Sequence, residues 1–426
     1  MVATALAACA SERPDPPADC AAVAQLGTTL AGAREAHRRG ALRQKLREHE
    51  ALEPGYTLRL TDAMTWRPNA ACVADLAEAG RLLFERQLGA ADGLVAPIAR
   101  VQRARQVGAR DSTSCTACHA RGGPAGAGGL PDDSYLEGDG ERVSSGDARN
   151  PPSLAGAGLV QALGEEMTRE LAAARDRALA TGDDTDLVAK GVGFGTLRVV
   201  HGHLDTRDVR GVDVDLVVRP FGWKGTTATL VEQVAESNAL HFGITSAAAR
   251  ALHDPVALGD AAPTLTDGQI TATAVYLATL DVPVTPAASR GAKIFDGLGC
   301  AGCHTPALPL VAPMVAVGSV RVPLPSGAVH LYSDLKRHDL GEANAALHHP
   351  GGIGARMYLT RRLWGAGETA PYFHDGESST VDAAIARHAG EAQAARDAWD
   401  ASTEADRSAL RVFLDSLRRA PQLQVP

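Results

Sequence analysis

The chain has 426 residues, of which 45% are hydrophobic and 22% charged, so it can bury large cores, and its length favours two or three globular domains. A formal net charge of -8 gives no electrostatic reason to expect nucleic acid as a partner. No stretch is long and apolar enough to span a bilayer as a helix, and 44 Gly, 24 Pro and only 4% aromatic residues indicate a loop-rich helical protein.

The N-terminal segment has features of an exported protein. An apolar run ends in the sequence LAAC at residues 6–9, which is similar to a bacterial lipobox with Cys9 as the lipidated residue, although the positive n-region of a signal peptide is missing. A Pro-rich tether over residues 11–19 follows. We therefore expect a periplasmic protein that contacts a membrane only through a lipid anchor at Cys9. A disordered Ala-rich tail is the alternative.

Two cysteines outside the recurring motif described next bear on the redox compartment. Cys20 and Cys72 belong to neither the motif nor the lipobox, and they could form a disulfide in an oxidising compartment. Free buried thiols are the alternative. Between them, residues 21–69 are predicted to form a helical extension, because LAGAREAHRRGALRQKLREHEAL has a helical composition.

The sequence Cys-x-x-Cys-His carries the chemistry, and it occurs as Cys115, Cys118 and His119 and again as Cys300, Cys303 and His304. Random placement would produce one copy in roughly four chains per thousand, so the histidines are part of the pattern. Thiol exchange needs only the two sulfurs, and zinc held by both Cys pairs would leave both histidines unused. Covalent haem c uses every position, because the thiols add to the vinyl groups and the His reaches the iron. The sequence therefore predicts two covalently bound haem c groups.

The residues before each motif repeat as well. A Gly is followed at helical spacing by large apolar residues, as Gly80, Leu83 and Phe84 in one copy and Gly291, Ile294 and Phe295 in the other. This pattern is typical of the N-terminal helix of a cytochrome c domain. We predict a mostly α fold with two cytochrome c-like haem domains in tandem and loop-rich insertions.

Domain boundaries follow from clusters of Pro, Gly and Asp. The prediction is a signal remnant and tether over 1–20, the helical extension over 21–69, a first cytochrome c domain over 70–254, a linker with a bridging helix over 255–286, and a second cytochrome c domain over 287–426.

Several blocks resemble a known family. LYSDLKRHDLG and LTRRLWGAGETAPYFHDGESSTVDAAIARHAGEA resemble the bacterial dihaem cytochrome c peroxidase superfamily, which includes the methylamine-utilisation dihaem enzyme. NPPSLAGAGLVQAL and VVRPFGWKGTTATLVEQVAESNALHFGIT extend the resemblance to the first domain. The blocks occur in the family's order and are most similar to its branch of dihaem oxidoreductases, also labelled thiol oxidoreductases.

The resemblance implies a ligand for the second haem. The family's distal ligand follows the TAPYFHDG block at the end of a helix, and the matching position in STVDAAIARHAGEA is His388. With His304 it would make the second haem bis-histidine, low-spin and suited to delivering electrons. A surface or propionate-contacting role for His388 is the alternative, and Met357 is the fallback ligand.

The resemblance also implies that the first haem is the peroxidatic one, with His119 as its proximal ligand. Trp223 matches a Trp that lies between the haems, with simple packing as the alternative, and Gln233 matches a distal Gln. The family's catalytic Glu, in a block ending Glu-Met-Gly, is replaced by His241. His241 is expected to act as general acid and base on peroxide, or else to ligate the iron and close the site.

Other groups are given structural roles. His201 and His203 are rival distal groups, although two histidines in a polar loop are more often exposed. His348 and His349 are expected to be exposed, with metal binding as the alternative. Tyr372, His374 and Asp375 belong to the PYFHDG block and are expected to pack around the second haem and to bond its propionates. Superfamily members hold calcium between the haems, but no acidic cluster here identifies a site, so calcium stays open.

Two hypotheses result. The first is an exported, haem-dependent oxidoreductase of the peroxidase type, in which the second haem accepts electrons from a small redox protein and the first reduces hydrogen peroxide or uses it to oxidise a partner protein. The second is a non-catalytic electron-transfer cytochrome with both irons six-coordinate. Peroxide binding to the ferric protein separates them.

Overall fold

The computed structural model describes residues 73–89, 94, 98–103, 110–130, 134–244, 246, 265–280 and 289–419. The predictions for the lipobox Cys9, the tether, the helical extension and the pair Cys20 and Cys72 lie outside the described residues. No helix in these ranges combines the length and the apolar character needed to cross a membrane.

The first repeat is built on two crossed helices, α4 (Val73–Glu85) and α10 (Asp267–Ala278). They meet at Gly80, where an added Cβ would overlap the backbone oxygen of Ala272. One turn further, the ring of Phe84 lies 5.5 Å from that of Tyr276. Only glycine permits this approach, because any side chain would push the two backbones apart.

The second repeat uses the same packing between α11 (Arg290–Gly297) and α14 (Glu404–Ser416). A Cβ on Gly291 would overlap the backbone oxygen of Ala409, and the ring of Phe295 lies 5.6 Å from that of Phe413. The repeat of Gly and Phe in the sequence thus marks the same helix crossing twice. The segment predicted to be a linker contains α10, which is the counterpart of α14; the domain boundaries themselves stay a prediction.

The prediction of a mostly α fold is wrong. In the described residues twelve strands form five small sheets beside the helices. The sheets consist of β1 (Val101–Arg103), β2 (Ser134–Gly138) and β3 (Asp147–Arg149); β4 (Thr185–Ala189), β5 (Val192–Val200) and β6 (His203–Asp205); β7 (Leu308–Leu310) with β10 (Gly327–Val329); β8 (Met314–Val317) with β9 (Val320–Pro323); and β11 (Arg337–Asp339) with β12 (Met357–Leu359). All pairs are antiparallel except β1 with β2.

The physical reason for this error is strand length. Most of these strands have three to five residues and lie among glycines and prolines, so each contributes too little alternation to stand out from a loop. They are stabilised by packing on helices. Leu308, Val315 and Val322, for example, are almost fully buried in the larger apolar core.

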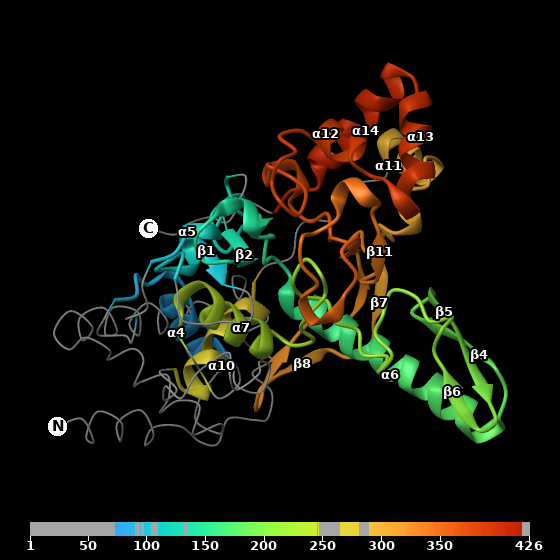
Figure 1. Cartoon of the computed structure of the whole chain (residues 1–426), viewed down its shortest axis with the longest axis horizontal. Coiled ribbons are helices and arrows are strands. Elements are labelled where there is room, and N and C mark those ends of the chain that lie inside the picture. The colour runs from blue at the N-terminus through green and yellow to red at the C-terminus, as the bar shows by residue number, and fades with distance from the viewer. Residues whose placement is uncertain are drawn as a thin grey trace, which may run out of the picture.

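The remaining helices place the other segments. The long helix α6 (Ala157–Thr181) runs across the molecule and carries β4 to β6 at its far end (Figure 1). Three further helices are α7 (Leu230–Phe242), α12 (Val381–Ala386) and α13 (Gln393–Ala401), and the two motifs lie on α5 (Cys115–Cys118) and on the 3-10 turn η4 (Cys300–Gly302). α7 starts with a capping box between Thr229 and Glu232 and ends at Gly243, which has a left-handed φ of 63°.

Buried side chains form two clusters. The larger joins α4, α6, α7 and α10 with strands β4, β5 and β7 to β10. The smaller lies around the second motif and consists of Phe295, Tyr332, Trp399, Leu410, Phe413, Leu414 and Leu417. Strands that follow the second motif in the chain therefore pack on helices of the first repeat, which joins the two repeats.

Candidate active site

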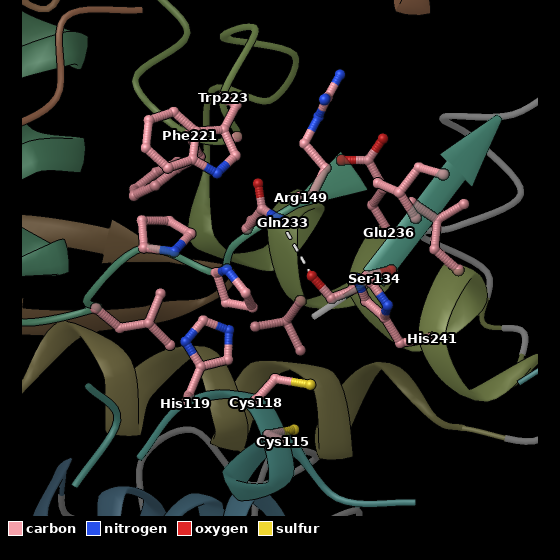
Figure 2. Close-up of a pocket in the computed structure, with 18 of the residues that line it drawn as sticks. Cys115, Cys118, His119, Ser134, Arg149, Phe221, Trp223, Gln233, Glu236 and His241 are labelled. Atoms are coloured by element: carbon pink, nitrogen blue, oxygen red, sulfur yellow. Dashed lines mark hydrogen bonds between the residues drawn. The ribbon is translucent and has the colours of Figure 1, made fainter. Parts of the chain in front are cut away.

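A cavity of about 280 Å³ opens beside the first motif. Cys115, Cys118 and His119 lie along one side of it, and Gln233, Glu236 and His241 reach it from α7 (Figure 2). Its size is near the lower end of the range for ligand-binding clefts. The residues that the sequence analysis assigned to the first site therefore lie around one cavity.

His119 is prepared to bind a metal ion. Its Nδ1 lies 3.0 Å from the backbone oxygen of Gly126, and its ring is 6.1 Å from that of Phe84. Burial lowers the pKa of His119 to about 4, so the imidazole is neutral although one edge borders the open cavity. A neutral imidazole that donates from Nδ1 to a carbonyl carries its lone pair on Nε2, which is the atom that can bind a metal ion.

The cysteines of the motif are in the form that haem attachment needs. None of the four motif cysteines is disulfide-bonded. Burial raises the pKa of Cys115 to about 12 and that of Cys300 to about 11, so both remain thiols at neutral pH. Addition of a thiol to a vinyl group requires reduced sulfur, and this condition is met at both motifs.

The second motif repeats the geometry of the first. The Nδ1 atom of His304 lies 3.0 Å from the backbone oxygen of Tyr332, and its ring is 6.4 Å from that of Phe295. Burial and the nearby His388 lower the pKa of His304 to about 4. Its Nε2 is therefore also available to a metal ion.

His388 lies opposite His304, as the resemblance implied. Their ring centres are 6.4 Å apart, and the Nδ1 atom of His388 is 2.8 Å from the backbone oxygen of Ala384. Two metal–imidazole bonds of about 2 Å each, plus roughly 1 Å from each nitrogen to its ring centre, give about 6 Å across a shared metal ion. Burial lowers the pKa of His388, which keeps it neutral. The fallback ligand Met357 lies on β12, paired with Asp339.

His241 is anchored on the far wall of the first cavity. Its Nδ1 lies 3.1 Å from Oδ1 of Asp111, and the hydroxyl of Ser134 donates to Oδ2 of the same carboxylate at 2.7 Å. Burial by itself lowers the pKa of His241, but the charge and hydrogen bond of Asp111, together with Glu236, raise it by more. The ring is held by one nitrogen and is biased toward the imidazolium form.

Gln233 is fixed by hydroxyl groups in the cavity wall. Its Oε1 accepts from the hydroxyl of Thr227 at 2.8 Å, and its Nε2 donates to the hydroxyl of Ser237 at 3.1 Å. This amide is oriented before any ligand enters, which is the arrangement that a polar group needs to position a small substrate.

Glu236 is a member of this wall that sequence reasoning missed. It lies one helical turn after Gln233 on α7 and lines the same cavity (Figure 2). Burial raises the pKa of Glu236 to about 7, against the opposing effects of nearby His241 and a hydrogen bond from Thr226. The only sequence signal was its i+3 spacing from Gln233, which any exposed helix could also show.

Trp223 connects the first cavity to the second repeat. It lines the cavity, and its Nε1 donates to the backbone oxygen of Asn150 at 2.8 Å. The backbone N–H of Asn150 in turn donates to the backbone oxygen of His374 at 2.7 Å. The guanidinium of Arg361 lies 4.8 Å from the indole centre.

Ring contacts continue from Trp223 to the second site. The ring of His374 lies 6.4 Å from Trp223 and 5.6 Å from Phe373, and Phe373 lies 5.6 Å from His388. Adjacent rings therefore lead from the wall of the first cavity to His388, opposite His304. Trp223 thus lies at one end of a series of ring contacts between the two sites, and whether it relays electrons or only packs stays a prediction.

The other candidate histidines lie elsewhere. His201 and His203 are exposed at the turn between β5 and β6, at the far end of α6 (Figure 1). His348 is half-buried, and its Nε2 lies 2.7 Å from the backbone oxygen of Ser145. His374 is buried and stacks on Tyr358 with ring centres 4.4 Å apart, which agrees with the packing role expected for its block.

One group with metal-ligand spacing occurs among the described residues. Cys303, Asp334 and His338 offer ligand atoms within 4.8 Å of one another. Calcium takes oxygen ligands, so a set with a thiol and an imidazole does not suit it. Burial alone would lower the pKa of His338, but Asp334 and Cys303 raise it to about 11, so the imidazole is a charged partner of the carboxylate.

The walls also fit the acidic groups of a haem. Arg361 and Arg362 both line the first cavity, and neither forms an ion pair with any residue in the described part of the chain. Burial lowers the pKa of both guanidinium groups, which shows how poorly they are compensated. The two propionates of a haem are carboxylates and would supply the missing counter-charge. The residues present therefore fit the group that the motifs imply.

Two buried neutral imidazoles, each following a pair of cysteines beside a repeated helix crossing, are the arrangement expected of a dihaem redox protein. A family described as "Di-haem oxidoreductase, putative peroxidase" matches residues 148–417, and the chain belongs to this family. The match starts after the first motif and includes the second.

Other comparisons add distant similarities. No curated protein matches the sequence. A MauG-like protein associated with microbial copper homeostasis is similar at 18% identity and a TM-score of 0.31, over 51% of this chain and 77% of that one. Hydrazine synthase from Kuenenia stuttgartiensis is similar at 15% identity and a TM-score of 0.30, over 80% of this chain and 87% of that one.

Proposed function

We propose that this di-haem oxidoreductase is an exported peroxidase-type enzyme with two covalently attached haem c groups. The first would be bound by Cys115, Cys118 and His119, and the second by Cys300, Cys303 and the histidine pair His304 and His388. When bound, the haems would supply single-electron transfer and, at the first site, the binding of peroxide. The substrate is hydrogen peroxide, which is reduced or is used to oxidise a partner protein.

The contrast between the two sites carries this proposal. His304 faces a second neutral imidazole at a separation that suits ligation of one metal ion. The cavity beside His119 is lined instead by the polar side chains Gln233, Glu236 and His241. A pair of facing imidazoles suits electron storage, whereas polar groups that can hydrogen-bond a small substrate suit catalysis, and this difference supports a peroxidase.

Residues of the cavity would handle the protons of the reaction. Breaking the O–O bond of peroxide requires a proton on the leaving oxygen, and His241 lines the cavity with one ring nitrogen held by Asp111. Its other nitrogen is the atom available to a bound peroxide. Gln233 is oriented by Thr227 and Ser237 and would position the substrate by hydrogen bonding.

Electrons would enter at the second haem from a small redox protein and pass along the ring contacts to Trp223. A net charge of -8 suits a basic donor, because transient redox contacts are often charge-steered. Export to the periplasm and a lipid anchor at Cys9 are supported by the lipobox-like sequence at residues 6–9.

One observation favours a second candidate function. His241 and His119 line the same cavity, so ligation of the first iron by His241 would make both irons six-coordinate and the protein an electron carrier. The hydrogen bond from His241 to Asp111 leaves Nε2 available in either case.

The visible spectrum of protein matured with haem c tests the proposal. Spectra of the ferric and half-reduced forms, with and without peroxide, should show a high-spin band that peroxide shifts. Two low-spin haems in every state, unresponsive to peroxide, would establish the electron carrier instead.

A further inference from the structure

The wall of the first cavity holds a second titratable group close to His241. Glu236 projects from the middle of α7 into the cavity, on the same helix as Gln233 and His241 (Figure 2). The side chain is only partly accessible, and it forms no ion pair with the described residues. A carboxyl in such a position is surrounded by protein on one side and faces the substrate space on the other.

The surroundings of Glu236 favour its neutral form. The charged groups that face it are His241 and Glu232 on its own helix and Glu137 on β2, and Thr226 donates a hydrogen bond to it. Arg149 on β3 also lines the cavity, but its guanidinium is paired with the carboxylate of Asp147, with 3.6 Å between the nitrogen and the oxygen. Burial dominates and raises the pKa of Glu236 to about 7, where it can both release and accept a proton near neutral pH.

His241 is shifted in the complementary way. The carboxylate of Asp111 holds its Nδ1 and raises its pKa, so the imidazolium form is favoured. With Nδ1 held by Asp111, His241 has one ring nitrogen left to exchange a proton with a substrate. Removal of a proton from one oxygen and delivery to the other can be divided between two groups, and Glu236 is a second titratable group that lines the same cavity.

We propose that Glu236 is a catalytic residue, the general base of the peroxide reaction, with His241 as the general acid. This inference rests on the proposed peroxidase function. The carboxylate takes the proton from one oxygen of hydrogen peroxide, and the imidazolium gives its proton to the other oxygen as the O–O bond breaks and water leaves. The second water forms when two electrons from the donor protein and two further protons arrive. Glu236 then loses its proton and His241 regains one, so both return to their starting forms. In total, hydrogen peroxide, two electrons and two protons give two water molecules.

The variant Glu236→Gln tests the assignment, because glutamine keeps the shape but cannot accept the proton. We expect kcat/KM for peroxide to fall about 100-fold, while haem content and the spectrum of the ferric protein stay unchanged. Glu236→Asp should recover part of the loss. Glu342→Gln is the control, since it removes an exposed carboxylate that does not line the cavity.

The pH dependence separates a base from a merely structural carboxyl. In the wild type, kcat/KM should rise with pH as Glu236 ionises near pH 7, and this rise should be absent in Glu236→Gln but present in Glu342→Gln. Loss of activity with the pH dependence intact would overturn the assignment.

An infrared titration gives a readout that does not depend on activity. A protonated carboxyl band that disappears around pH 7 in the wild type and is missing in Glu236→Gln supports the inference. Identical infrared titrations of the two proteins, or a Glu236→Gln variant as active as the wild type, would overturn it while the peroxidase function stands. A wild type that does not consume peroxide would overturn the proposed function as well.

Discussion

The two repeats share a scaffold and differ in what faces the histidine of the motif. In each, a glycine allows two helices to cross in contact, a phenylalanine lies beside the motif His, and a backbone carbonyl holds its Nδ1. His304 then meets His388 from the end of α12, whereas His119 borders a cavity walled by α7. One motif can thus serve two purposes, because the opposite side of the site decides whether substrate can enter.

Polarity follows the same division. The second site is faced by an imidazole that burial keeps neutral, and neighbouring Phe373 adds an apolar ring 5.6 Å away. The first site is faced by two titratable groups: burial raises the pKa of Glu236 to about 7, and Asp111 and Glu236 raise that of His241 against the effect of burial. Such groups are useful in proton transfer and of no use to a site that only carries electrons.

His388→Ala is expected to have the largest effect, because it removes the side chain that makes the second site different from the first. We expect the second haem to lose a ligand and become high-spin, so that both haems respond to peroxide in the visible and electron paramagnetic resonance spectra. Met357→Leu is the control and should leave the second haem low-spin. If Met357→Leu produced the change and His388→Ala did not, the fallback ligand would be the correct one.

His241→Ala should remove the acid from the open site. We expect kcat/KM for peroxide to fall by about 100-fold to 10,000-fold, with the spectrum of the second haem unchanged. Stopped-flow reduction of peroxide measures the loss, and the exposed His203→Ala serves as the control. A first haem that changes spin state in His241→Ala would show instead that His241 is a ligand.

Gly80→Ala and Gly291→Ala test whether the helix crossing is equivalent in both repeats. Each added Cβ would overlap a backbone oxygen of the partner helix, so we expect each variant to lose about 1–3 kcal/mol of unfolding free energy or more. Gly297→Ala is the control, because a Cβ there meets no atom within 4 Å. Equal stability of all three variants in thermal unfolding would contradict the crossing.

Asp111→Asn should have the smallest effect, since it changes only the pKa of His241 and keeps the imidazole itself. The pKa of His241 is raised in the folded protein, so its stabilising contribution is present below pH 6.5 and is lost as pH rises through the higher folded value. Without the carboxylate we expect that contribution to disappear and peroxide reduction at pH 7 to fall roughly 10-fold. The pH dependence of unfolding and of kcat/KM measures both, with the exposed Asp183→Asn as control.

Part of the fold followed from sequence and part did not. Repeated Gly and Phe predicted the helices α4 and α11, because helical spacing is visible within a few turns. The strands escaped prediction because most are short and depend on packing against distant helices. The partner of α4 was also unforeseen: α10 follows it by almost 200 residues, and no local pattern reveals which helix crosses which.

The candidate site divides in the same way. Spacing within Cys-x-x-Cys-His was sufficient to nominate both proximal histidines, because the two cysteines and the histidine lie within five residues and would serve one haem. The family resemblance supplied His388, Gln233 and His241. Glu236 remained unnoticed because a glutamate on a helix is usually exposed, and its neighbours from β2 become visible only in the folded chain.

The sequence by itself determined the chemistry that this protein can hold: two attachment motifs, their histidines and the repeated helix that supports each. The tertiary structure alone decided how the two sites differ, since Asp111 and His241 are 130 positions apart and act together only after folding. The physical reason is that a Cys-x-x-Cys-His motif is made by neighbours along the chain, whereas burial, hydrogen bonding and pKa depend on neighbours in space.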